Sequence, residues 1–127
     1  MSSGDVVGDW IDVGAGDALA EGGAGIRFGL PRAVGGAAGG FAVRVGGAVR
    51  AYLNRCAHVP VELDSPPGRF LDDTGRVVVC ATHGARYHGE TGACAGGPCR
   101  GRPLSPLSPL PARERAGRLE VLLPRAD

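Results

Sequence analysis

Glycine and proline interrupt this chain so often that no segment keeps a helical period. The 127 residues include 23 glycines and 10 prolines. Both residues disfavour a helix interior, because glycine adds backbone entropy to the unfolded chain and proline lacks an amide proton. Between these breaks lie short β-branched or alternating segments, which favour strands. We therefore expect a loop-rich, all-β chain of antiparallel sheets, with at most one helical turn within Asp17–Gly22.

The clearest expected hairpin lies between residues 41 and 54. Phe41–Val45 and Val49–Asn54 both alternate in side-chain character, as strands with two different faces do. Gly46-Gly47 between them suits a two-residue turn that needs positive φ. We expect further strands at Trp10–Val13, Ile26–Leu30, Phe70–Asp72, Val77–Val79, around Tyr87 and Cys94, and at Arg118–Leu123. We expect loops at Ala15–Gly25 and Val34–Gly40, and an extended, irregular segment over Pro98–Pro111.

Charge and hydropathy exclude several classes of function. The net charge is only +1, and the charges are scattered, so there is no basic stripe of the kind that binds nucleic acid. No apolar stretch is long enough to span a membrane. The first ten residues lack the basic and apolar regions of a signal peptide, which predicts a cytoplasmic protein. In that reducing compartment, four cysteines are expected to be metal ligands or free thiols.

Two mixed pairs of cysteine and histidine stand out against the scarcity of both residues. They are Cys56-Ala57-His58 and Cys80-Ala81-Thr82-His83, and each lies in an expected loop beside a strand. Two neighbouring loops of this kind can each offer one thiolate and one imidazole to a shared centre. Thiolate favours iron–sulfur chemistry, and imidazole suits iron as well as zinc. A mononuclear Cys2His2 zinc site remains an alternative, although zinc fingers usually pair cysteine with cysteine and histidine with histidine along the chain.

The two pairs and the residues after them resemble the Rieske family. The family pattern is C-x-H, an interval, then C-x-x-H followed by glycine. Here it reads Cys56-Ala57-His58 and Cys80-Ala81-Thr82-His83-Gly84, and Gly84–Tyr87, Thr91-Gly92 and Gly97-Pro98 continue it in the family's order. The resemblance covers about Arg55–Leu107. It implies a [2Fe–2S] cluster with Cys56 and Cys80 on one iron and His58 and His83 on the other.

The resemblance also bears on the cluster's reduction potential. Two neutral imidazoles in place of thiolates raise the potential to about −150 to +300 mV, from about −400 mV in plant-type ferredoxins. High-potential relatives carry a serine where this chain has Ala85, and a tyrosine that matches Tyr87. A loop containing Pro98 is implied to cover the cluster. Their extra disulfide cannot form here, because Val61 and Thr82 occupy its positions. We therefore expect a potential low in the Rieske range, raised somewhat by Tyr87.

Cys94 and Cys99 lie outside the proposed ligand set. They flank Ala95–Pro98 near the implied proline loop. We interpret them first as two free thiols, with a local disulfide and a role as alternative ligands or redox thiols left open. Their spacing is not that of a zinc knuckle.

The resemblance implies a single Rieske domain over residues 1–127. Its fold would be an antiparallel β-sandwich with a small cluster-binding subdomain over about Asn54–Leu104. The implied function is one-electron transfer, in which a flavin-dependent reductase reduces the protein and a terminal oxygenase or another redox enzyme accepts the electron. The chain is then a non-catalytic carrier or enzyme component. A small subunit of a larger oxidoreductase, similar to that of nitrite reductase, stays open, as does the zinc module.

Overall fold

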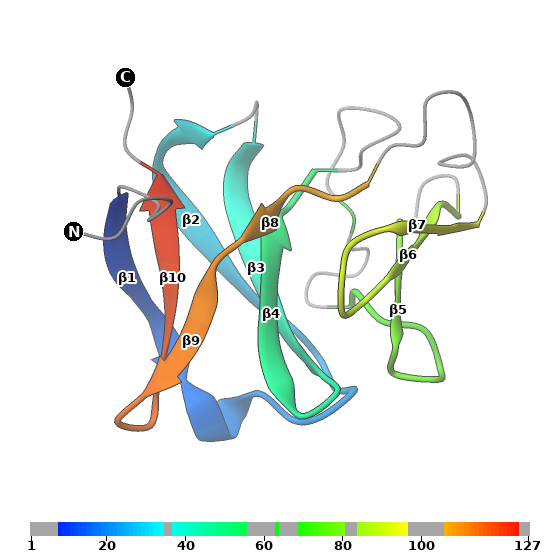
Figure 1. The fold of residues 1–127 in the computed structure, drawn as a ribbon, viewed down its shortest axis with the longest axis horizontal. Helices are drawn as coiled ribbons and strands as arrows, with labels where there is room; N and C mark the ends of the chain where they lie inside the picture. The colour runs from blue at the N-terminus through cyan, green and yellow to red at the C-terminus, as the bar shows by residue number, and fades with distance from the viewer. Residues whose placement is uncertain are drawn as a thin grey trace, which may run out of the picture.

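The computed structural model describes residues 8–34, 37–55, 63, 69–80, 84–96 and 106–124. Within these ranges the protein is built from antiparallel strands, and the one helical element is the short 3-10 helix Gly16–Ala18 (Figure 1). This confirms the all-β class expected from the frequent glycine and proline breaks. In the described part of the chain, no helix has the length and apolar character needed to cross a bilayer.

The strands of the described residues form three sheets. The first has the order β1-β10-β9, the second β2-β3-β4-β8, and the third β5-β6-β7. Figure 1 shows the first two sheets facing each other in one larger body, with the third sheet beside β3 and β4. The bounds are β1 Gly8–Ala15, β2 Ile26–Val34, β3 Ala37–Val45, β4 Ala48–Leu53, β5 Val77–Val79, β6 Arg86–His88, β7 Cys94–Gly96, β8 Pro109–Leu110, β9 Ala112–Arg115 and β10 Arg118–Pro124.

The β3–β4 hairpin is the element that the sequence predicts best. Its turn residues Gly46 and Gly47 have φ of 69° and 80°, as the two central residues of a type I′ turn require. The turn sets the register Val45↔Ala48, which continues along the strands to Phe41↔Tyr52 and Gly40↔Leu53. The backbone amides of both turn glycines donate hydrogen bonds to the Glu21 carboxylate.

The β3–β4 hairpin is buried on both faces, so it belongs to two hydrophobic cores. Phe41, Val43, Val45 and Tyr52 face the third sheet and pack with Phe70, Val78 and Tyr87. Ala42, Ala51 and Leu53 point the other way and pack against Leu119 and Val121 of the first sheet. Because successive side chains of a strand alternate between faces, a strand with apolar residues in both positions must be covered on both sides.

Tyr52 connects the second sheet to the third. Its side chain is 2% exposed, and its hydroxyl donates a hydrogen bond to the Gly89 carbonyl at 2.8 Å. Gly89 and Gly92 lie in the turn between β6 and β7. A Cβ on Gly92 would lie 2.8 Å from a Tyr52 ring carbon, so this turn packs directly on the ring. The Phe41 ring stacks on Phe70 with centroids 4.0 Å apart, which adds a second contact between the two parts.

Several expected boundaries were wrong, each for a local reason. β2 continues past Pro31 to Val34, which an edge strand permits because its outer amides need no partner. The expected loop Val34–Gly40 instead contains the start of β3. Gly40 suits this strand because the Phe28 ring covers it, with ring carbons within 2.7 Å of where a Cβ would lie. The expected strand Phe70–Asp72 is reduced to one bridge, Leu71↔Val78.

The strand β9 was not predicted, because its sequence Ala-Arg-Glu-Arg is mostly charged. It forms through its pairing with β10. Within the expected irregular segment Pro98–Pro111, the structure describes residues 106–111, which include the two-residue strand β8. β8 pairs with β4, so the chain passes from the second sheet to the first at Pro111.

Removing the Tyr52 hydroxyl should loosen the junction between the second and third sheets. Tyr52→Phe keeps the ring and its contact with Phe41 but leaves the buried Gly89 carbonyl without this donor. We expect the free energy of unfolding to fall by about 1–2 kcal/mol, measured by urea denaturation. An unchanged midpoint and slope would show that the hydrogen bond does not contribute.

Tyr52 should also make the fold sensitive to alkaline pH. Burial raises the pKa of Tyr52 from 10.0 to about 12. The unfolded chain therefore loses this proton near pH 10, while the folded chain keeps it until about pH 12, so stability falls as pH rises through this window. Tyr52→Phe should lose less stability than the wild type between about pH 10 and 12, and parallel pH profiles would contradict this.

Candidate metal centre

The second cysteine–histidine loop begins at Cys80, which lies in the described part of the chain. β5 ends at Val79, and Cys80 follows it directly. The Cys80 side chain is wholly buried in the core that contains Val78 and Tyr87, and it is not part of a disulfide. A buried cysteine at the end of a strand has a fixed backbone, which is what a thiolate ligand needs to hold its position.

Backbone hydrogen bonds close the base of this second loop. The Cys80 amide donates to the Ala85 carbonyl at 2.9 Å, and the Gly84 amide donates to the Cys80 carbonyl at 2.8 Å. Gly84 has a φ of 76°, a conformation that only glycine adopts without strain. The hairpin β5–β6 therefore continues through Cys80 and Ala85.

The predicted site residues fall partly within the described chain. Cys80, Ala85 and Tyr87 are described, and all three are wholly buried in one core. Cys56, His58, His83 and Pro98 lie outside the described residues. Among the described residues, no three His, Cys, Asp or Glu side chains gather as a metal site, and this part of the chain contains only one of the four candidate ligands.

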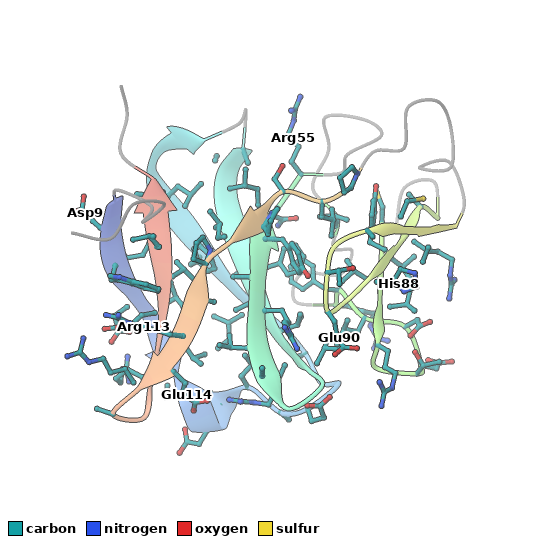
Figure 2. All side chains as sticks on the ribbon, in the orientation of Figure 1. Asp9, Arg55, His88, Glu90, Arg113 and Glu114 are labelled. Carbon is teal, nitrogen blue, oxygen red and sulfur yellow. The ribbon has the colours of Figure 1, made fainter. Side chains whose placement is uncertain are left out.

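The first cysteine–histidine loop starts where β4 ends. Leu53 is the last residue of β4, and the Arg55 amide donates to its carbonyl at 2.9 Å, which turns the chain sharply at Asn54. Figure 2 shows Arg55 at the end of the hairpin opposite the Gly46-Gly47 turn. The chain re-enters the described part at Leu63, which packs in the same core as Cys80. Leu63, after the first loop, and Cys80, at the start of the second, therefore share one hydrophobic core.

Sequence reasoning missed Asn54, a buried polar residue at the base of the first loop. It is 4% exposed, and its Oδ1 accepts a hydrogen bond from the Leu63 amide at 2.9 Å. Its backbone amide donates to the Gly39 carbonyl, also at 2.9 Å. The position of Asn54 in the sequence could have indicated its role. It is a polar residue that follows the apolar end of an alternating strand and precedes Arg55-Cys56.

Charged residues near the second loop form an ion pair. Arg86 on β6 lies 2.8 Å from the Asp72 carboxylate. Hydrogen bonds from the Thr74 hydroxyl and amide, together with the Arg86 charge, hold the pKa of Asp72 below its usual value. Of the histidines, His88 lies on β6 and is exposed, so it points into solvent.

The expectation of a free thiol at position 94 was wrong, because Cys94 is disulfide-bonded. Its partner lies outside the described residues, as does Cys99. Cys94 begins β7 and is half-buried against the core that contains Cys80.

The donor chemistry of the described part fits a mixed sulfur and nitrogen centre. Cys80 offers a buried sulfur, and the imidazole-bearing His83 directly precedes Gly84 in the sequence. Sulfur and imidazole together suit iron–sulfur centres of the type in which two histidines replace two cysteines. At Ala85, the side chain supplies no hydroxyl donor.

Solved structures share this fold over nearly the whole chain. A chain in a complex of reduced oxygenase and oxidized ferredoxin of carbazole 1,9a-dioxygenase is 25% identical with a TM-score of 0.67, covering 93% of this chain and 97% of that one. A ferredoxin of Sphingomonas yanoikuyae B1 is 19% identical with a TM-score of 0.71, covering 91% and 100%.

A larger protein contains the same fold as one part. The terminal oxygenase of carbazole 1,9a-dioxygenase from Novosphingobium sp. KA1 is 20% identical with a TM-score of 0.74, and the match covers 96% of this chain but 31% of the oxygenase. No curated protein sequence matches the chain. Residues 9–113 match the Rieske [2Fe-2S] domain family, so the chain belongs to that family and its cofactor is a [2Fe–2S] cluster.

Proposed function

We propose that this protein is a one-electron carrier whose Rieske cluster delivers electrons to a terminal oxygenase or another oxidoreductase. The family match over residues 9–113 carries the proposal. It is supported by the likeness to a chain from a complex of oxygenase and ferredoxin, which covers almost the full length of both chains. A flavin-dependent reductase is the proposed electron donor.

The proposed ligands are Cys56 and Cys80 on one iron and His58 and His83 on the other. The cluster supplies a site that gains and loses one electron, and the protein controls its potential and its exposure. The buried Cys80, the hydrogen-bonded base of its loop and the left-handed Gly84 support the second pair. Leu63, in the same core as Cys80, supports a first pair nearby. Tyr87 and Pro98 are proposed to tune the cluster.

The proposed domain plan is a single Rieske domain over residues 1–127, with the cluster-binding subdomain over about 54–104. In this plan the β3–β4 hairpin is the base on which the subdomain rests, through Phe41 and Tyr52. A chain of this kind transfers electrons without transforming a substrate. The proposed docking site of the partner is beside the two histidines of the proposed ligand set.

We also propose a cytoplasmic location and no contact with nucleic acid or membrane. The scattered charges and the net charge of +1 support the absence of nucleic-acid binding. A cytoplasmic location implies that the Cys94 disulfide is reduced in the cell, because structural disulfides are rare in reducing compartments. Cell fractionation with thiol labelling of Cys94 tests this location: an oxidised Cys94 in the cell would contradict it.

The purified protein should be red-brown, contain two irons per chain as a [2Fe–2S] cluster requires, and give a rhombic EPR signal when reduced. His83→Ala should abolish this signal. His88→Ala is the matched control, because His88 is exposed on β6 and should leave the signal unchanged. One zinc per chain, or a signal that survives His83→Ala, would refute the assignment.

The electron-transfer role has its own test. A flavin-dependent reductase with NADH should reduce the protein, and the reduced protein should be reoxidised by a terminal oxygenase in the presence of its substrate. If the protein instead copurifies in a fixed complex with one large redox enzyme and does not shuttle between a reductase and an oxygenase, it is a subunit of that enzyme.

Strain placed beside His83 should destabilise the cluster more than the fold. Gly84→Ala adds a Cβ that meets nothing within 4 Å, so its cost is the positive φ alone, about 1 kcal/mol. Gly47→Ala is the matched control, with φ of 80° and equally open space in the β3–β4 turn. Both should lower the urea midpoint similarly, but only Gly84→Ala should speed cluster loss. Equal cluster loss in both would contradict the proposed role of the second loop.

A further inference from the structure

The two ligand-bearing loops differ in how their ends are joined. The second loop continues a hairpin, so main-chain hydrogen bonds between Cys80, Gly84 and Ala85 close it. The first loop leaves β4 at Asn54 and returns at Leu63, and Leu63 belongs to no strand of the described chain. The hydrogen bond that the structure shows across these ends comes from a side chain, from the Leu63 amide to Asn54 Oδ1.

Asn54 is well placed to hold both ends of the first loop. Its own amide is fixed to the Gly39 carbonyl of β3, and the Arg55 amide bonds to Leu53 across it, so its backbone cannot move independently of the hairpin. Its side chain is buried, and a buried amide group without a partner is costly. The bond to Leu63 therefore forms in a setting where water cannot replace it.

Leu63 links the end of the first loop to the core that contains the start of the second loop. Its side chain is wholly buried and lies in one core with Cys80, Ala85 and Tyr87. A restraint on the Leu63 backbone is therefore a restraint on how the base of the first loop meets the base of the second. Residues that orient ligands without touching the metal commonly set affinity and potential.

We propose that Asn54 is a positioning residue for the first ligand pair: its buried carboxamide closes the base of the loop that carries Cys56 and His58 and fixes this pair relative to Cys80. The inference rests on the proposed assignment of Cys56 and His58 as ligands. It concerns a residue that touches neither iron in this assignment and acts through the loop.

The test compares three variants of the cluster-loaded protein. Asn54→Leu removes the acceptor for the Leu63 amide, and Asn54→Asp keeps an oxygen in its place. Tyr52→Phe is the matched control, because it also removes one buried side-chain-to-backbone hydrogen bond, but the acceptor of that bond, Gly89, lies in the β6–β7 turn. Cluster release to an iron chelator is followed by the loss of visible absorption, and the reduced proteins are compared by EPR and redox titration.

Asn54→Leu should release the cluster about tenfold faster than the wild type, the factor that loss of one buried hydrogen bond produces in an opening equilibrium. Its EPR lines should broaden, because His58 no longer has one fixed orientation. Asn54→Asp should restore slow release, and Tyr52→Phe should alter the release rate and the EPR line shape less than Asn54→Leu does. If Asn54→Leu does not fold, Asn54→Ala provides the same comparison.

Two results separate failure of this inference from failure of the proposed ligand set. If Cys56→Ala keeps the cluster and its spectrum, the ligand assignment is wrong and the role of Asn54 falls with it. If Cys56→Ala loses the cluster but Asn54→Leu matches Tyr52→Phe in release rate and in EPR line shape, the ligands stand. In that case Asn54 stabilises only the fold, and the inference is overturned.

Discussion

The burial of the β3–β4 hairpin between two other layers is the constraint on which the rest of the protein depends. Phe41 and Tyr52 face the third sheet, while Ala42 and Ala51 face the first. One face therefore stabilises the sandwich and the other carries the small sheet with Cys80. Since the hairpin belongs to both cores, the position of Cys80 is coupled to the packing of the first and second sheets.

Two different kinds of hydrogen bond fix the ends of the two cysteine–histidine loops. At the second loop, main-chain hydrogen bonds extend the β5–β6 ladder through Cys80 and Ala85. At the first loop, a side-chain amide spans the gap between β4 and Leu63. A metal site needs ligands held in position by their surroundings, and loops gain this only when their ends are fixed. The small third sheet and the Asn54 contact both provide fixed ends.

The sequence predicts well wherever one local pattern decides the structure. The Gly46-Gly47 turn with alternating flanks gave the β3–β4 hairpin, and the valine run Val77–Val79 gave the strand that leads into Cys80. The sequence predicts a segment poorly where its structure depends on pairing or packing with a distant part of the chain. Gly40 lies in a strand because Phe28 covers it, and the charged strand β9 exists because β10 pairs with it. The bonded state of Cys94 likewise depends on geometry that spacing alone does not supply.

The fold class, the family and the candidate donors can be inferred from residue order alone, because strand periodicity, turn glycines and the spacing of the two Cys/His pairs are all local in the chain. Which face of the hairpin carries the third sheet, and how the loop ends are held, depend on contacts between distant segments. The contacts of Tyr52 with Gly89 and of Asn54 with Leu63 show the reason. The hydrogen-bond partner of a buried polar group depends on which backbone groups lie near it after the sheets have packed, so residue order alone does not identify it.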